Sequence, residues 1–396
     1  MPGARAEAEA TRGTISPALH SPGYNVYVQL DLTADQEALR DAVRDVLAKE
    51  CTPTRLRAHV DHIVRDEPSE LGQELWQTAV SLDWPALCVP EADGGIGLGV
   101  VELAVMAEEL GRVVAPGALS PTMCSYVPVL RAAGAHDELV AVAAGAVRGA
   151  VGLADGGGLL RPETVSASAT ADGADWCLAG TKRNVLGAVD ADELAVVVRV
   201  DDDLALAVVP AADVEITPVR ALDTTRTIGH VDLDGVHIDG ARLHRCGAAA
   251  IAAGAQEVAV ADALELVGTC QVIFDVTVAY AKERVQFDVP IGSFQAVKHK
   301  LANMFVIIER ARAVGLFAAA TIEEDDPRRA SASSMAKAAA GDCAHLVARD
   351  GIQLLGGIGY TWEHDQHIWV KRAKAGESLR GTAADHRTVV ADLLGL

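Results

Sequence analysis

The spacing of hydrophobic and polar residues changes twice along the chain. Over residues 32–148, apolar positions recur every three or four residues, which is typical of amphipathic helices. The clearest examples are 71–82 and 101–110. Thr33 and Gln36 have the spacing of a capping box, in which each side chain pairs with the other residue's backbone amide. The first part of the chain is therefore predicted to be helical.

The middle of the chain, residues 150–243, has a different pattern of hydrophobic and polar residues. Short runs rich in β-branched residues alternate with turn residues such as those at 171–173 and 201–203. The predicted strands are 164–170, 176–179, 194–200, 204–209, 214–218 and 230–236. Short strands at this spacing predict a small β-barrel or sandwich.

From residue 247 onward the helical spacing returns. Val260, Leu264 and Val267 form a stripe on one long helix. Further helices are predicted at 301–322, 333–355 and 384–394. The fold class is therefore α+β, in the order helical, β, helical.

The 396 residues divide on this basis into a tail and three domains. Residues 1–27 mix charged residues with Gly and Pro and are predicted to be disordered, with no apolar segment of the kind found in a signal peptide. The predicted domains are 28–149, 150–246 and 247–396.

Composition and charge narrow the functional classes. Lys and Arg total 34 against 55 Asp and Glu, so the net charge is −21. Such a chain would repel phosphate, which argues against nucleic-acid and anionic-membrane partners. Apolar runs reach about ten residues, short of the ~20 that span a bilayer. The seven cysteines are scattered without a C-x-x-C, which favours reduced thiols and a cytoplasmic location.

Several common motifs are absent from the sequence. The glycine clusters at 94–99 and 356–359 do not match G-x-G-x-x-G, and there is no P-loop, H-E-x-x-H or G-x-S-x-G. His364 and His367 lie three residues apart, but no third ligand cluster accompanies them. No metal site is predicted.

The C-terminal third carries a specific set of motifs. It reads Y-A-K-E-R-V-Q-F-D-V-P-I-G-S-F-Q at 280–295, L-A-N-M at 301–304 and Q-L-L-G-G-I-G-Y at 353–360. These are followed by K-R-A-K at 371–374 and G-T at 381–382.

In combination, these motifs strongly resemble the acyl-CoA dehydrogenase family, and the three-part order agrees with it over about residues 30–396. The resemblance implies a helical N-terminal domain, a β middle domain and a C-terminal four-helix bundle. It implies an FAD-dependent oxidoreductase of lipid metabolism, which removes an α-proton and a β-hydride from an acyl-CoA thioester. An electron-acceptor flavoprotein is the implied redox partner.

The resemblance also assigns cofactor contacts by position. In the family, several of these residues bind FAD across a subunit interface, and Gly suits a site where a side chain would block the cofactor. For Arg284, a solvated charge at a helix end is the alternative. The implied FAD-binding residues are Arg284, Gln286, Phe287, Gln295, Gln353, Gly356, Gly357 and Thr382.

The usual catalytic Glu, immediately before the closing Gly-Thr, is replaced by Arg380. A guanidinium stays protonated and cannot act as a general base. A second base position known in the family falls on Val258. Asp262 lies one turn further on the same helix face, and Glu257 is rotated by about 100°. Either carboxylate is a candidate for a relocated base or substrate contact, or a capping or interhelical polar residue.

Other departures affect the flavin ring. Asn184 and Leu186 occupy the family's stacking and hydrogen-bonding places, and Asp288 replaces the Gly of Q-F-G. The retained residues belong to the part of the FAD site that reaches a neighbouring subunit. The lost ones hold the reactive ring.

These observations favour one subunit of a homo- or hetero-tetramer that completes its active site with a second acyl-CoA dehydrogenase-like chain. The 361–364 segment resembles an actinobacterial-type branch that acts on steroid side-chain thioesters. Two alternatives stay open: a self-sufficient flavoenzyme with a relocated base, and a non-catalytic partner subunit.

Overall fold

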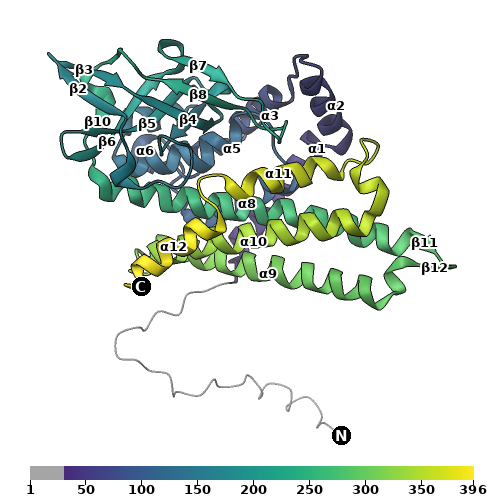
Figure 1. Ribbon diagram of the computed structural model, residues 1–396. Coiled ribbons are helices and arrows are strands. Elements are labelled where there is room, and N and C mark those ends of the chain that lie inside the picture. The colour runs from purple at the N-terminus through teal and green to yellow at the C-terminus, as the bar shows by residue number, and fades with distance from the viewer. Residues whose placement is uncertain (1–30) are drawn as a thin grey trace, which may run out of the picture.

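The computed structural model describes residues 31–396, so the predicted disordered tail at 1–27 lies outside the described residues. Helices occupy the first part, strands the middle and long helices the last part (Figure 1). The predicted α+β order is confirmed.

The N-terminal part consists of short and medium helices. They are α1 (Ala34–Glu50), α2 (Pro53–Val64), α3 (Leu71–Ser81), α4 (Val100–Arg112), α5 (Leu119–Pro121), α6 (Val127–Ala133) and α7 (His136–Ala143). The predicted capping box is present: the Thr33 amide donates to Gln36 Oε1 at 2.9 Å, and the Gln36 amide donates to Thr33 Oγ1 at 3.2 Å. A π-helical turn, Thr122–Tyr126, joins α5 to α6.

The middle part forms two main sheets. The strands are β1 (Gly149–Gly152), β2 (Ser168–Asp172), β3 (Asp175–Ala179), β4 (Thr181–Leu186), β5 (Glu193–Val200), β6 (Asp203–Pro210), β7 (Glu215–Pro218), β8 (Ile228–Asp232), β9 (Val236–Ile238) and β10 (Leu243–His244). The larger sheet has the order β10-β6-β5-β2-β3-β9, with β1 parallel to β5, and the smaller has the order β4-β8-β7. Apolar side chains from both sheets share one core.

The barrel alternative for this region was wrong. Closure requires the two edge strands of a sheet to pair, but β10 and β9 end the larger sheet, and β4 lies in the smaller one. Two predicted strands also differ: 164–170 begins as a strand only at Ser168, and 230–236 is divided between β8 and β9 by a turn.

The C-terminal part is built from long helices. They are α8 (Gly247–Glu283), α9 (Gln295–Glu323), α10 (Arg329–Leu355), α11 (Gln366–Ser378) and α12 (Ala383–Leu393). Helices α8, α9 and α10 pack side by side, α11 contacts both α8 and α10, and α12 packs on α10 (Figure 1). A hairpin of β11 (Val285–Gln286) and β12 (Val289–Pro290) joins α8 to α9.

One hydrophobic core extends through the N-terminal and C-terminal helices and includes side chains from β5 and β6, so all three parts of the chain share their packing. None of the helices in residues 31–396 combines the length and apolarity needed to cross a membrane.

Candidate functional site

A largely apolar cavity of about 190 Å³ lies where the C-terminal helices meet the middle part of the chain. Its walls come from the loop after β1, the first half of α8, the start of α10, and α12. Its charged lining residues are Asp262, Lys337 and Arg380. We call this space the α8–α12 cavity.

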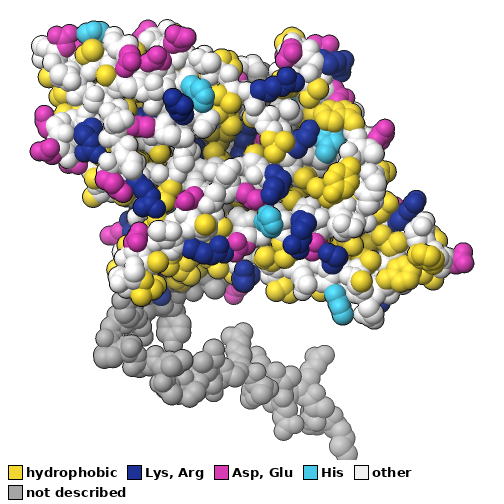
Figure 2. All heavy atoms as spheres, viewed as in Figure 1, with side chains coloured by type: hydrophobic (Ala, Val, Ile, Leu, Met, Phe, Trp, Pro, Cys, Tyr) yellow, Lys and Arg dark blue, Asp and Glu magenta, His cyan; other side chains and the backbone are white. Residues whose placement is uncertain are grey.

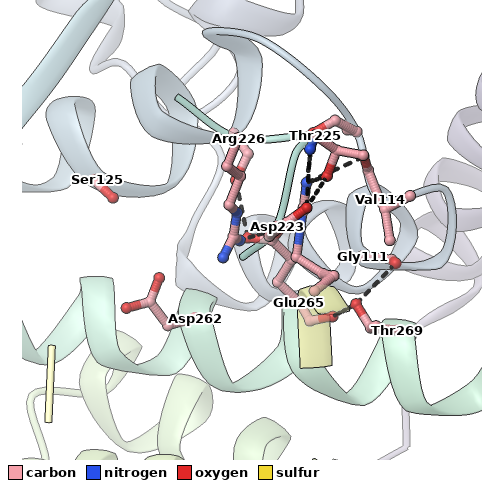
Figure 3. Close-up of polar contacts among 12 residues, drawn as sticks. Gly111, Val114, Ser125, Asp223, Thr225, Arg226, Asp262, Glu265 and Thr269 are labelled. Atoms are coloured by element: carbon pink, nitrogen blue, oxygen red, sulfur yellow. Dashed lines mark hydrogen bonds and ion pairs between the residues drawn. The ribbon is translucent and has the colours of Figure 1, made fainter. Parts of the chain in front are cut away.

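Arg380, which the resemblance assigns to the position of the family's catalytic Glu, is held by an ion pair. Its Nη1 donates to both carboxylate oxygens of Asp262 at 2.8 Å, and its Nη2 donates to Ser125 Oγ at 2.9 Å. Ser125 belongs to the π-helical turn, and Asp262 projects from α8 toward it (Figure 3). The Arg380 side chain is 11% exposed and that of Asp262 4%, so this is a largely buried pair.

Two further side chains fix the loop that carries Arg380. Lys337 Nζ donates to the carbonyls of Gly376 and Gly381 at 3.2 and 3.0 Å, and burial lowers its pKa to about 8. His386 Nε2 contacts the Arg380 carbonyl at 3.2 Å, and burial lowers the pKa of this imidazole to about 4. The buried Nδ1 of His386 has no hydrogen-bond partner within residues 31–396.

Sequence reasoning did not identify Lys337 or His386. A lone lysine within the Ala- and Ser-rich run of α10 was the available signal, because a charge inside an apolar helix needs a specific partner. His386 had no comparable signal, since its position depends on how α12 packs.

A buried ionic network lies further along α8 (Figure 3). Arg372 pairs with Asp223 and, at 2.5 Å, with Glu265, which also pairs with Arg226 at 2.5 Å. Burial alone would raise the pKa of Asp223 and Glu265, but the two guanidinium groups outweigh it and hold both pKa values below their usual range. The network ties α11 and the loop before β8 to α8.

The two predicted base candidates are both engaged. Glu257 pairs with Arg131 of α6, and burial raises the pKa of its carboxyl. Asp262 is held by Arg380 as described. The nearby Glu377 accepts two hydrogen bonds from Lys374 Nζ at 2.7 Å. Each of these carboxylates therefore has a cationic partner in the structure.

The predicted FAD contacts at the α8–α9 junction lie on the surface. Arg284, Gln286, Phe287 and Gln295 are all exposed, with Phe287 at 87%. The side chain of Arg284 has no hydrogen bond or ion pair to any other residue within 31–396. Phe287 packs edge-on against Phe294, with ring centroids 6.2 Å apart. Exposed donors beside an aromatic ring fit a cofactor shared with another chain.

The glycines after α10 leave their backbone open. No atom lies within 4 Å of an ideal Cβ at Gly356 or Gly357, and Gly356 has a φ of +66°. The preceding Gln353 is exposed. Thr382 differs from the other predicted contacts, because its hydroxyl donates to Asp385 Oδ2 at 2.7 Å and caps α12.

The region that would hold the flavin ring does not fit FAD, unlike the exposed contacts described above. Between the loop after β1 and strand β4, the structure leaves a cavity of only about 10 Å³, roughly one water molecule. A Cβ on Gly157 would lie 2.5 Å from the Arg183 carbonyl oxygen, so the loop already touches the strand. Asn184, which the resemblance assigns to the family's stacking place, has a φ of +55°. The exposed contacts fit FAD, whereas this pocket has no room for its ring.

The histidines at 364 and 367 have other contacts. The His364 Nδ1 accepts from the Gln366 amide at 3.1 Å, and His367 stacks on Trp362 with centroids 4.3 Å apart. Within residues 31–396 no group of three or more His, Cys, Asp or Glu side chains is placed to hold a metal ion.

Family models and individual relatives agree on the family that this chain resembles. Residues 33–138 match the acyl-CoA dehydrogenase N-terminal domain, and residues 245–395 match the acyl-CoA dehydrogenase C-terminal domain. Acyl-CoA dehydrogenase IpdE2 of Mycolicibacterium smegmatis is 31% identical over 353 residues, which cover 88% of this chain and 96% of that protein. Acyl-CoA dehydrogenase FadE34 of Mycobacterium tuberculosis is 30% identical over 86% of this chain, and the chain spans 45% of FadE34.

Solved structures share the fold. The ChsE4-ChsE5 complex from Mycobacterium tuberculosis aligns with a TM-score of 0.83 and 25% identity, covering 93% of this chain and 99% of that one. A variant of the Tcur3481-Tcur3483 steroid ACAD aligns with a TM-score of 0.80 and 28% identity, covering 91% of this chain and 98% of that one.

Proposed function

This chain belongs to the acyl-CoA dehydrogenase family of oxidoreductases, which use FAD, and we propose that it is the subunit of a two-chain enzyme that completes the active site of an unlike partner. The partner supplies the general base and the contacts to the flavin ring. The reaction is the α,β-dehydrogenation of an acyl-CoA thioester, and an electron-acceptor flavoprotein reoxidises the reduced flavin.

The state of Arg380 carries this proposal. We infer that Arg380 occupies the family's base position, and its guanidinium is already paired with Asp262. A guanidinium cannot remove an α-proton at neutral pH. For this chain to catalyse the reaction alone, another carboxylate would have to act.

The self-sufficient alternative is less well supported. Both oxygens of Asp262 accept from Arg380, so taking a proton would require this buried ion pair to break. Glu257 is engaged by Arg131. Asp262→Ala separates the two alternatives, since it would abolish the turnover of a self-sufficient enzyme without loss of FAD.

The exposed contacts at the α8–α9 junction support a shared cofactor. FAD carries a pyrophosphate, for which an unpaired guanidinium such as Arg284 is a suitable donor. Two similar solved structures carry names that join two chains, and one is described as a steroid ACAD. These names support a heteromeric assembly, for which we propose a tetramer and a bulky acyl group such as a steroid side chain.

The decisive experiment compares the chain alone with the chain co-expressed beside an acyl-CoA dehydrogenase-like partner that retains the catalytic Glu. The expected result is a mixed complex by native mass spectrometry, with bound FAD and acyl-CoA oxidation that the isolated chain lacks. Stoichiometric FAD and turnover in the isolated chain would refute the proposal.

A pair of variants tests the shared cofactor within that complex. Arg284→Ala should lower FAD occupancy at least about tenfold, because a charge-assisted hydrogen bond is lost. Arg220→Ala is the matched control, since Arg220 is also exposed but lies after β7. Equal FAD occupancy in both variants would remove Arg284 from the site.

A further inference from the structure

The α8–α12 cavity is lined mainly by apolar side chains, together with a few charged ones. Leu153, Leu159, Ala255, Val389 and Leu393 belong to the walls. Arg380, Asp262, Lys337 and His386 are the titratable residues of the lining, which also includes Gln256, Ser333 and Ser334. A mainly apolar pocket with a few polar groups favours a ligand with an apolar body and one polar group.

The guanidinium of Arg380 has donor capacity to spare. Its hydrogen bonds within residues 31–396 use Nη1 for Asp262 and Nη2 for Ser125, and Nε has no partner there. A guanidinium has five N–H donors, and its fork geometry matches a carboxylate. The unused donors therefore suit an anionic oxygen.

The net charge of the cavity lining also favours an anionic ligand. Two cationic side chains, Arg380 and Lys337, face one carboxylate, Asp262. His386 is neutral at pH 7, because burial lowers its pKa to about 4. The deeper network of Arg226, Arg372, Asp223 and Glu265 is balanced within itself. One further negative charge would neutralise the lining.

From this geometry we infer that the α8–α12 cavity binds a free carboxylic acid as its carboxylate, with the carboxylate on Arg380 and the hydrocarbon body along the apolar walls. A thioester carbonyl would accept a hydrogen bond but would leave the excess positive charge uncompensated. The cavity of about 190 Å³ exceeds the engineered 150 Å³ cavity that accepts benzene. A medium-chain or single-ring acid is therefore the expected size. The proposed function assigns no role to this cavity.

The test is titration calorimetry of the isolated full chain at pH 7 with octanoate, octanol and octanoyl-CoA. Octanoate should bind at least about tenfold more tightly than octanol, because hydrogen bonds to a charged group are the stronger ones. Octanoyl-CoA should bind more weakly than octanoate. Binding of octanol or octanoyl-CoA as tight as that of octanoate, or no binding of octanoate, would overturn the inference.

Variants locate the bound acid. The double variant R380Q/D262N removes the cation without leaving a buried carboxylate unpaired, and it should lose octanoate binding about tenfold or more. Arg387→Gln is the matched control, because Arg387 lies nearby on α12 but is 56% exposed and pairs with Asp342 at the surface. Equal affinity in R380Q/D262N and the wild type would also overturn the inference. The experiment needs neither flavin nor turnover, so its failure is distinguishable from failure of the proposed function.

Discussion

Arg380 combines an unusual backbone conformation with side-chain contacts to Asp262 and Ser125. Its φ is +51°, in the left-handed region that costs a residue other than Gly about 1–2 kcal/mol. The ion pair with Asp262 and the contact from His386 to its carbonyl hold this conformation. Lys337 binds the carbonyl of the following Gly381. The loop is thus fixed from α8, α10 and α12 together.

Breaking the Arg380–Asp262 pair should destabilise the protein unless both partners change. Arg380→Gln leaves the Asp262 carboxylate buried without its cation, and we expect a loss of about 3 kcal/mol in the free energy of unfolding. R380Q/D262N should recover most of this loss. Urea unfolding of the two single variants and the double variant measures the coupling, and strictly additive effects would contradict it.

Only part of the Arg380 site could be predicted from the sequence. The replacement of the base by Arg380 is a prediction that rests on the local register of the C-terminal motifs. The pairing with Asp262 could not, since the two residues are 118 positions apart and nothing local specifies how α8 faces the α11–α12 loop. Lys337 and His386 were missed for the same reason: their roles depend on packing between helices.

At the scale of elements, α4 and α8 meet closely at glycines. A Cβ on Gly268 would lie 1.9 Å from the Glu108 carbonyl oxygen, and a Cβ on Gly111 would lie 2.0 Å from that of Glu265. Each helix therefore touches the backbone of the other. Because backbone cannot yield as a side chain can, these glycines set the separation of the two helices and with it the position of Glu265.

Gly268→Ala should therefore cost about 3 kcal/mol of unfolding free energy or more, at the upper end of the usual range for overpacking. The matched control is Gly158→Ala, since no atom lies within 4 Å of a Cβ at Gly158. Thermal unfolding of the two variants decides the point. A Gly268→Ala protein as stable as Gly158→Ala would show that the helices can separate without cost.

The elements that could be predicted are the long ones with a regular apolar spacing. Helices α8, α9 and α10 fall in this class. Helix α11 was not predicted, because Gln366 and Arg372 are buried polar residues that disturb its pattern. Strand β4 was not predicted either. It contains Lys182, which is fully buried and donates hydrogen bonds to Asp155 and to the Leu153 carbonyl. Arg372 and Lys182 are both paired with residues distant in sequence, so the local pattern did not reveal the helix or the strand.

At the scale of the whole molecule, apolar side chains are exposed at the end that carries the β11–β12 hairpin (Figure 2). Phe287 is 87% exposed, and on α9 Phe305 and Val306 are 49% and 64% exposed. A chain with a net charge of −21 should repel its own copies. We therefore predict that these exposed apolar groups belong to an interaction surface.

Placing a charge on this surface should prevent assembly without unfolding the chain. Phe305→Glu is expected to shift the complex toward single chains in analytical ultracentrifugation, while its far-UV circular dichroism stays unchanged. Val140→Glu, at a 50% exposed position on α7, is the control. If both variants assemble like the wild type, α9 takes no part in the interface.

The pH dependence of stability is set in part by two buried histidines. His59 and His386 both have a pKa lowered to about 4, mainly by burial, from the usual 6.5. Between pH 6.5 and 4 the unfolded chain binds protons that the folded chain does not, so stability falls as pH falls through this window. Asp223 and Glu265, whose pKa values are lowered, contribute stability that is lost at still lower pH.

The histidine contribution can be isolated with the double variant H59Q/H386Q. From pH 6.5 to 5 each native histidine should cost about 1.5 kcal/mol of unfolding free energy, from the linkage between proton binding and stability. Carboxyls with a raised pKa, such as Glu108 and Glu257, act in the opposite direction and are present in both proteins. The difference between wild type and variant therefore reports the histidines alone.

Urea unfolding at the two pH values should show the wild type losing about 3 kcal/mol more than the variant. Equal losses would mean that both imidazoles titrate in the folded protein as they do in the unfolded chain.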